Sequence, residues 1–264
     1  MKKAIVNISE GLGNQLFMYA HAYAFSKKKG YKLFVDSTSS YKNLKIRNFL
    51  LDNFNLDLNY ADADDIPDNF FKNIKFKIDK NIDKYRSRKK FLIEKREKNK
   101  TTKFQDYTNI NFADNLFIKG YFESEKYFED YKNDIIKKFT IKNINLRNLC
   151  FNPNELLKEN SVSIVIRQHR FSEKINNTNN RNKSELFVKK TIDYINKASE
   201  IISSRILNPR FYIFSNDVSN LKEIFDKDSY KVVSHKSDKP LSDFYLSTLC
   251  KHFIVGPSTF HWWS

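Results

Sequence analysis

The chain has 264 residues, 40% of them hydrophobic and 15% aromatic, so it is long enough to bury one large core or two small ones. Five Gly and five Pro are too few for a propeller or a turn-rich β-sandwich. An excess of 47 Lys and Arg over 31 Asp and Glu gives a formal charge of +16. This charge attracts anions such as a sugar nucleotide, a phosphorylated lipid, an acidic membrane surface or nucleic acid, although much of the lysine fits an ordinary solvated surface.

The N-terminal 36 residues predict a β-α-β unit. A short apolar strand over residues 4–8 precedes a turn with Gly11 and Gly13, and a second strand covers 32–36. Between them, apolar residues recur at helical spacing over 16–24. Alternation of this kind is typical of a parallel sheet with helices on its faces.

Residues 72–103 are strongly basic, with 14 Lys and Arg against four acids. The alternation of Ile74, Phe76 and Ile78 predicts a short strand, and residues 85–100 predict a charged helix. Each basic residue at an anionic membrane surface contributes roughly 1 kcal/mol. A mobile, solvated excursion is the ordinary interpretation of such a segment, and contact with a membrane or a lipid-linked acceptor is the functional alternative.

The second half repeats the same rhythm. We expect two Rossmann-type domains facing a cleft, residues 1–150 (with 72–103 as a basic insertion) and 151–264. The predicted strands cover 162–166, 211–214, 231–233 and 253–255, and the predicted helices 186–204, 219–225 and 241–251. The apolar side of the first of these helices is expected to carry Val188, Ile192, Ile195, Ile201 and Ile202.

Polar sequences follow several of these strands, where ligands of parallel sheets bind. The Gly11-x-Gly13 turn before a helix suits an anion, although it lacks the third glycine of the dinucleotide fingerprint. Arg167 and Arg170 follow the 162–166 strand, and a guanidinium fits a diphosphate bidentately. Ordinary surface basicity is the alternative for both arginines.

Two further segments offer hydrogen-bonding groups after a strand. Asp217 suits a guanine or a ribose hydroxyl, but it equally suits a helix cap. Ser258 and Thr259 at a predicted helix start suit phosphate oxygens. Trp262 and Trp263 are expected to anchor the core.

The cysteines and the N-terminus predict a cytoplasmic protein, with peripheral contact at the inner face of the membrane as a further expectation. Cys150 and Cys250 lack metal-ligand spacing, so buried reduced thiols are expected. The apolar stretch at the N-terminus is too short for a signal peptide, and no run of 18 apolar residues is present.

Five segments are similar, in order, to motifs of one enzyme family. Residues 10–20 resemble GGLGNQxFQYA, 120–128 resemble GYxQSEKYF, 162–171 align with VSIHIRRGDY, 214–217 with FSDD, and 251–263 with KHxIxxNSTFSWW. These motifs belong to the bacterial α-1,2-fucosyltransferases, glycosyltransferase family 11. The resemblance spans nearly the whole chain.

The resemblance implies a GT-B-like α/β fold and inverting transfer of fucose from GDP-fucose. The expected acceptor is a galactoside-type glycan of surface polysaccharide or lipopolysaccharide, and neither a metal nor another cofactor is implied. Glu173 and His169 are the candidate bases, since a base must come within about 3 Å of the acceptor hydroxyl. Arg167 is expected at the diphosphate and Asp217 at the guanine. The full expected donor-binding set is Gly11, Gly13, Asn14, Arg167, Arg170, Asp217, Ser258 and Thr259.

Several positions depart from the family motifs. Val165 replaces the histidine, Gln168 the second arginine, Arg170 the aspartate, and Pro257 an asparagine. Another GDP-deoxy-sugar as donor, or a degenerate binding protein without catalysis, are therefore the alternatives. No RNA-recognition, zinc or helix-turn-helix pattern supports a nucleic-acid partner. The sequence stops at Ser264, so the helices with which the family continues are expected to be missing.

Overall fold

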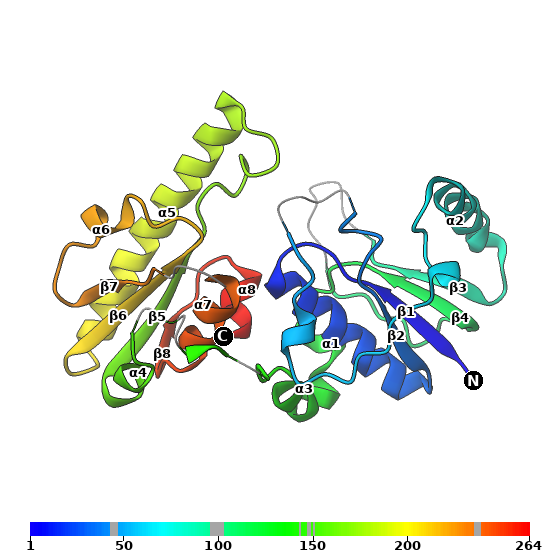
Figure 1. The fold of residues 1–264 in the computed structure, drawn as a ribbon, viewed down its shortest axis with the longest axis horizontal. Coiled ribbons are helices and arrows are strands. Elements are labelled where there is room, and N and C mark those ends of the chain that lie inside the picture. The colour runs from blue at the N-terminus through cyan, green and yellow to red at the C-terminus, as the bar shows by residue number, and fades with distance from the viewer. Residues whose placement is uncertain (43–46, 96–102, 143, 147–148, 150, 235–238) are drawn as a thin grey trace. The chain divides into compact units, whose positions relative to one another are not determined.

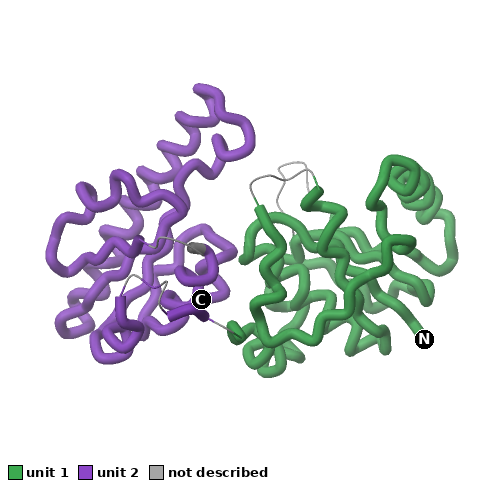
Figure 2. Tube along the Cα trace, viewed as in Figure 1, with its two compact units in different colours: residues 1–142 green, residues 143–264 purple. Residues whose placement is uncertain are grey.

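A computed structural model describes residues 1–42, 47–95, 103–142, 144–146, 149, 151–234 and 239–264. The chain forms two compact units, residues 1–142 and 143–264 (Figure 2), whereas the boundary expected from the sequence lay at residue 150. Within the described residues, each unit is built on a four-stranded sheet in which all neighbouring strands are parallel. Figure 1 shows the elements of both units.

The sheet of unit 1 has the strand order β2-β1-β4-β3. Its strands are β1 (Lys3–Asn7), β2 (Lys32–Asp36), β3 (Lys89–Ile93) and β4 (Phe112–Lys119). The predicted β-α-β unit is confirmed, because α1 (Leu12–Lys29) connects β1 to β2. Gly30 ends α1 at a φ of 69°, a left-handed conformation that glycine adopts without strain. Strand β4 was not predicted from the sequence.

The predicted elements of the basic segment are wrong. Residues 74–78 lie in α2 (Phe70–Ile82), not in a strand. Residues 89–93, expected in a helix, form the edge strand β3, and residues 96–100 lie outside the described residues. Apolar residues occur on two opposite faces of α2, and two faces of a helix together mimic the alternation of a strand.

Short elements complete unit 1. The helix α3 covers Lys132–Lys138. Single 3₁₀ turns occur at Leu51–Asn53, Ala63–Asp65, Asp83–Tyr85, Glu125–Tyr127 and Glu129–Tyr131.

The sheet of unit 2 has the order β7-β6-β5-β8. Its predicted strands and helices are confirmed with shifts of up to three residues at their ends, except that the helix expected from residue 186 begins at Thr178. The strands are β5 (Asn160–Ile166), β6 (Pro209–Ser215), β7 (Tyr230–Val232) and β8 (His252–Ile254). The helices are α4 (Asn154–Lys158), α5 (Thr178–Ser203), α6 (Leu221–Ile224), α7 (Lys239–Thr248) and α8 (Thr259–Trp263).

Helices cover both faces of the unit 2 sheet. On one face, Ile195 of α5 packs with Ile164 and Ile213, and on the other, Leu246 of α7 packs with Val165 and Phe214. Of the expected stripe, Ile195 is buried, Val188, Ile192 and Ile202 are partly buried against the same core, and Ile201 is exposed. Successive strand residues alternate between these two cores.

Cys250 is buried as a free thiol, as expected, and Cys150 lies outside the described residues. Burial raises the pKa of the Cys250 thiol to about 12, so the thiol stays protonated and unreactive at neutral pH. Within the described residues, no helix combines the length and apolar character needed to cross a bilayer.

Candidate functional site

Three loops of unit 2 follow β5, β6 and β8 at the same edge of the sheet. Because these strands are parallel neighbours, their carboxyl ends meet there, where ligands of such sheets bind. Figure 1 shows α5 beginning beyond the carboxyl end of β5 and running back along the sheet. The predicted residues 167–173, 215–217 and 256–259 occupy these loops.

Gln168 joins the loops after β5 and β6. Its backbone N–H donates to Oδ1 of Asn216 at 2.8 Å, and its carbonyl accepts from Nδ2 of Asn216 at 3.1 Å. Its side-chain amide donates to the Asp217 carbonyl at 2.7 Å and to Oδ1 of Asn220 at 2.9 Å. Gln168 is buried, so it holds the loops together instead of supplying a cation as arginine would.

His169 and Asp217 form the second link between these loops. Nε2 of His169 lies 2.8 Å from Oδ2 of Asp217, and the other carboxylate oxygen accepts from the backbone N–H of Ser219 at 3.0 Å. The hydrogen bond from His169, followed by that from Ser219, lowers the pKa of Asp217 to about 2. The carboxylate is therefore ionised at neutral pH.

The two arginines of the first loop have different partners. Nη2 of Arg167 lies 2.7 Å from Oε2 of Glu173, so the candidate base is held in an ion pair with the candidate phosphate ligand. Nη1 of Arg170 donates to the Pro257 carbonyl at 2.8 Å, and its guanidinium lies 4.9 Å from the centre of the Phe187 ring. Arg170 thus connects the loop after β5 to the loop after β8.

Ser258 and Thr259 follow this contact. Ser258 occupies the position before α8, without a side-chain hydrogen bond to the helix backbone, and Thr259 begins the helix. Trp262 is exposed, so the expectation that it anchors the core is wrong. The structure therefore brings together Arg167, His169, Arg170, Glu173 and Asp217, with Ser258 next to the residue that Arg170 contacts.

A cavity of about 360 Å³ lies beside this cluster, between the loop after β5, the N-terminal half of α5 and the start of α6. The sequence missed its α5 wall because the helix was expected to begin only at residue 186. The spacing of Arg181, Ser184 and Val188 could have indicated this face. The lining residues are Gln168, His169, Ser172, Arg181, Ser184, Glu185, Val188, Lys189, Ile192, Asp193 and Asn220.

The remaining predicted residues lie in unit 1, where Gly11 ends the turn between β1 and α1 and Gly13 and Asn14 lie in the first turn of α1. Glu10 has a φ of 64°, and Gly11 precedes the helix in extended conformation. A Cβ atom placed on Gly11 would lie 3.6 Å from Nε of Arg47. The sequence missed Arg47, which brings a guanidinium to the start of α1.

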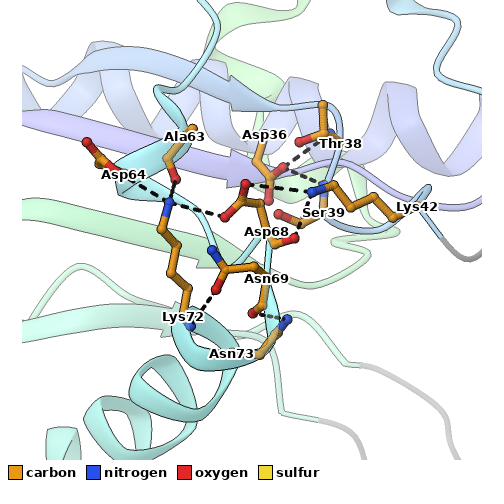
Figure 3. A network of polar contacts seen from close by, with 10 residues as sticks. All are labelled: Asp36, Thr38, Ser39, Lys42, Ala63, Asp64, Asp68, Asn69, Lys72 and Asn73. Carbon is orange, nitrogen blue, oxygen red and sulfur yellow. Dashed lines mark hydrogen bonds and ion pairs between the residues drawn. The ribbon is translucent and has the colours of Figure 1, made fainter.

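Side chains fix this turn from both directions. Gln15, fully buried, donates to the carbonyls of Glu10 at 2.9 Å and Asn48 at 2.8 Å. At the end of β2, Oδ2 of Asp36 accepts from Nδ2 of Asn7 at 2.8 Å. Oδ1 of Asp36 accepts from the backbone N–H of Ser39 at 2.9 Å (Figure 3). Hydrogen bonds from buried side chains thus hold the residues that directly follow β1 and β2, as a binding surface requires.

No cluster of three His, Cys, Asp or Glu side chains suited to a metal ion occurs in the part of the chain that the structure describes.

The fold defines the class of protein. The chain superposes on the fucosyltransferase NodZ from Bradyrhizobium with a TM-score of 0.59 at 13% identity, covering 99% of this chain and 91% of NodZ. A structure of NodZ soaked with GDP-fucose matches with a TM-score of 0.58. The fold is therefore that of the GT-B-like glycosyltransferases.

The chain belongs to glycosyl transferase family 11, whose pattern matches residues 3–264, and it is a glycosyltransferase. It is 27% identical to an α-1,2-colitosyltransferase of Escherichia coli, over 100% of this chain and 87% of that protein. It is 24% identical to the O-antigen biosynthesis glycosyltransferase WbnK of Escherichia coli, over 97% and 87% of the two chains. The family resemblance inferred from the five motifs is confirmed.

Backbone geometry explains two positions of the family motifs. Glu10 and His169 stand where GGLGNQ and HIRRGD have glycine, and they adopt φ values of 64° and 55°. These left-handed conformations favour glycine. Both positions of this chain thus have a backbone conformation that suits glycine, although the residue is not glycine.

Proposed function

We propose that this glycosyltransferase transfers a deoxy-sugar from a GDP-linked donor to a glycan acceptor in surface polysaccharide or lipopolysaccharide synthesis. The simplest form is inverting α-1,2-transfer of fucose to a galactoside-type acceptor. The observation that carries the proposal is the cluster of Arg167, His169, Arg170 and Asp217 at the carboxyl edge of the unit 2 sheet. The similarity to WbnK, an O-antigen biosynthesis glycosyltransferase, supports this class of acceptor.

Arg167 is assigned to the diphosphate. As the bond from the sugar to GDP breaks, its electrons pass to the leaving phosphate, and a fixed guanidinium offsets the growing charge. Glu173 holds one side of this guanidinium at 2.7 Å, which restricts its orientation and leaves its other N–H groups for phosphate oxygens. Arg170, Ser258 and Thr259 are assigned to the same phosphates, so GDP binds without a metal or another cofactor.

Asp217 is assigned to the guanine. Each of its oxygens already accepts one hydrogen bond, and each retains acceptor capacity for the N–H groups of the base. Because its pKa lies at about 2, the carboxylate is present as an acceptor throughout the neutral range.

An inverting displacement also needs a base for the acceptor hydroxyl. The acceptor O–H bond breaks as the new bond to the sugar forms, and the proton passes to the base. Glu173 and His169 are the two candidates for this role. Glu173 lies beside Arg167, which is assigned to the diphosphate, whereas His169 is hydrogen-bonded to Asp217, which is assigned to the guanine. Gly11, Gly13 and Asn14 are assigned to the transferred sugar.

A second candidate is transfer of a different GDP-deoxy-sugar. Val165 replaces the histidine expected beside the donor, and the similarity to a colitosyltransferase favours a donor other than fucose. In both versions we propose a cytoplasmic enzyme that has no nucleic-acid partner.

Calorimetric titration with GDP tests the donor site. We expect binding that is equal with magnesium and with a chelator, and that weakens at least about tenfold in Arg167→Ala because a charge-assisted hydrogen bond is lost. Arg210→Ala is the matched control, since Arg210 lies at the amino end of β6, where its guanidinium donates to the Asp228 carbonyl. Equal GDP affinity in Arg167→Ala and wild type would remove the diphosphate assignment.

The sugar is tested by measuring GDP release from GDP-fucose and other GDP-deoxy-sugars with galactoside acceptors. Turnover of one donor identifies it. Tight GDP binding without turnover of any donor contradicts the proposed enzyme activity and indicates the degenerate binding protein.

A further inference from the structure

The outer face of α2 is an exposed apolar stripe. At 3.6 residues per turn, its apolar residues other than Phe76 fall on one side of the helix. Phe70 and Phe71 are 72% and 81% exposed, and the following Tyr85 is 80% exposed. The stripe consists of Phe70, Phe71, Ile74, Ile78 and Ile82, all of them exposed.

The opposite side of α2 attaches it to unit 1. The Phe76 ring lies 4.9 Å from that of Phe91 and 4.6 Å from that of Phe117, measured between ring centres. Figure 1 shows α2 standing beside β3 and β4. Phe76 thus supplies the contact between α2 and the core. The stripe on the other side of the helix is therefore not needed to hold α2 in place.

Polar contacts fix the start of α2. Asn69 caps the helix, its Oδ1 accepting from the backbone N–H of Lys72 at 3.0 Å. Nζ of Lys72 lies 3.2 Å from Oδ1 of Asp68, and Nζ of Lys42 donates to the Asp68 carbonyl at 2.7 Å, as Figure 3 shows. The helix is therefore anchored with the stripe pointing away from the sheet.

Lysines border this stripe. Lys75 and Lys77 flank the stripe on opposite sides, and Lys80 lies farther around the helix, beyond Lys77. Within the described residues, none of the three forms an ion pair with an acid, unlike Lys72, Arg86 and Arg88. Exposed Phe and Ile bordered by lysines without acidic partners are the pattern of a helix that lies in the headgroup region of a bilayer.

We infer that the outer face of α2 docks on an anionic lipid bilayer, with Phe70, Phe71 and Ile78 inserted among the acyl chains and Lys75 and Lys77 against the headgroups. Charge selects this occupant over a second copy of the chain. A net charge of +16 and matching lysines around both stripes oppose pairing of two copies, whereas an anionic surface attracts them. The inference does not depend on which sugar the enzyme transfers.

Vesicle sedimentation with the full chain tests the docking face. We expect binding to vesicles of phosphatidylcholine mixed with phosphatidylglycerol, and much weaker binding to phosphatidylcholine alone. The double variant Phe71→Ser/Ile78→Ser should reduce the partition coefficient at least about tenfold, because two large apolar side chains no longer insert. Lys75→Gln/Lys77→Gln should reduce it on the mixed vesicles only.

The matched control is Ile175→Ser/Leu207→Ser, which removes two exposed apolar side chains of unit 2 and should bind vesicles as the wild type does. GDP release on a soluble acceptor should be unchanged in every variant, which separates this test from that of the transferase activity. Three results would overturn the inference: no binding to the mixed vesicles at low salt, equal binding by Phe71→Ser/Ile78→Ser and wild type, or a wild-type dimer that this variant converts to a monomer.

Discussion

The imidazole of His169 and the carboxylate of Asp217, 48 positions apart in sequence, meet at 2.8 Å across the loops after β5 and β6. His169 makes this contact from a left-handed backbone with a φ of 55°. Such a conformation costs an L-residue roughly 1–2 kcal/mol. The contact with Asp217 and the left-handed backbone of His169 can therefore be tested separately by different substitutions at this position.

Comparison of His169→Ala with His169→Gly separates them. Both variants lose the contact with Asp217, but only glycine relieves the backbone. After the greater flexibility of glycine in the unfolded chain is subtracted, His169→Gly should be more stable than His169→Ala by about 0.5–1 kcal/mol. Urea denaturation measures the difference. Equal stability would show that the loop relaxes to another conformation without cost.

The ion pair of Arg167 with Glu173 predicts a kinetic difference. If Glu173 orients Arg167, Glu173→Gln keeps a hydrogen-bond acceptor and chiefly raises the KM for the donor, by about threefold to tenfold. If Glu173 is the base, kcat falls by about a hundredfold or more. We expect the first result, because Glu173 is held in the ion pair with Arg167. Steady-state measurements at saturating acceptor distinguish the two.

The elements of unit 2 could be predicted because each apolar pattern there fits only one type of secondary structure. Residues 162–166 form a continuous buried strand, and Val188, Ile192 and Ile195 lie on a single helix face. In the basic segment the alternation fits a strand as well as a helix with two apolar faces, since Phe76 faces the core and Ile74 and Ile78 face outward. No local pattern separates these two faces, and the prediction failed.

Of the candidate site, the sequence located the loops but not their contacts. Strand ends predict that residues 167–173 and 215–217 share an edge. The pairing of Arg167 with Glu173, and the approach of Arg47 to Gly11, depend on side-chain directions within loops. Those directions follow from tertiary packing, which local sequence does not encode.

A buried histidine makes unit 1 sensitive to acid. His21 of α1 is buried with its ring stacked on Phe122 at 3.8 Å between centres. Neither of its ring nitrogens has a hydrogen-bond partner in the described part of the chain. Burial lowers its pKa to about 3, so the folded protein keeps the imidazole neutral while the unfolded chain protonates below about pH 6.5.

Stability should therefore decrease as the pH falls from about 6.5 toward 3, by up to about 1.4 kcal/mol per pH unit from this residue. His21→Leu removes the titrating group. Between pH 7.5 and pH 5, the wild type should lose about 2 kcal/mol more unfolding free energy than the variant. Denaturant titrations at both values measure this loss. The same loss in both proteins would exclude His21 as the source.

A methyl group added at Gly120 is expected to reduce the stability of the protein more than one added at Gly30. Gly120 follows β4 and begins the segment that resembles GYxQSEKYF. A Cβ atom at this position would lie 2.4 Å from Cβ of Glu94 and 2.8 Å from Cζ of Phe122. Glu94, itself buried, accepts hydrogen bonds from the backbone N–H groups of Tyr121 at 2.7 Å and Phe122 at 3.1 Å. The glycine lets these groups approach.

Gly120→Ala should therefore displace Glu94 and cost about 3 kcal/mol or more, because overpacking adds to the loss of hydrogen bonds to a buried carboxylate. Gly30→Ala is the comparison, since Gly30 has a left-handed φ of 69° but no atom near its absent Cβ. That change should cost only about 1 kcal/mol. Thermal and urea unfolding measure both variants. If the two variants were equally stable, the close approach of Glu94 to the Gly120 backbone would not determine the packing of this segment.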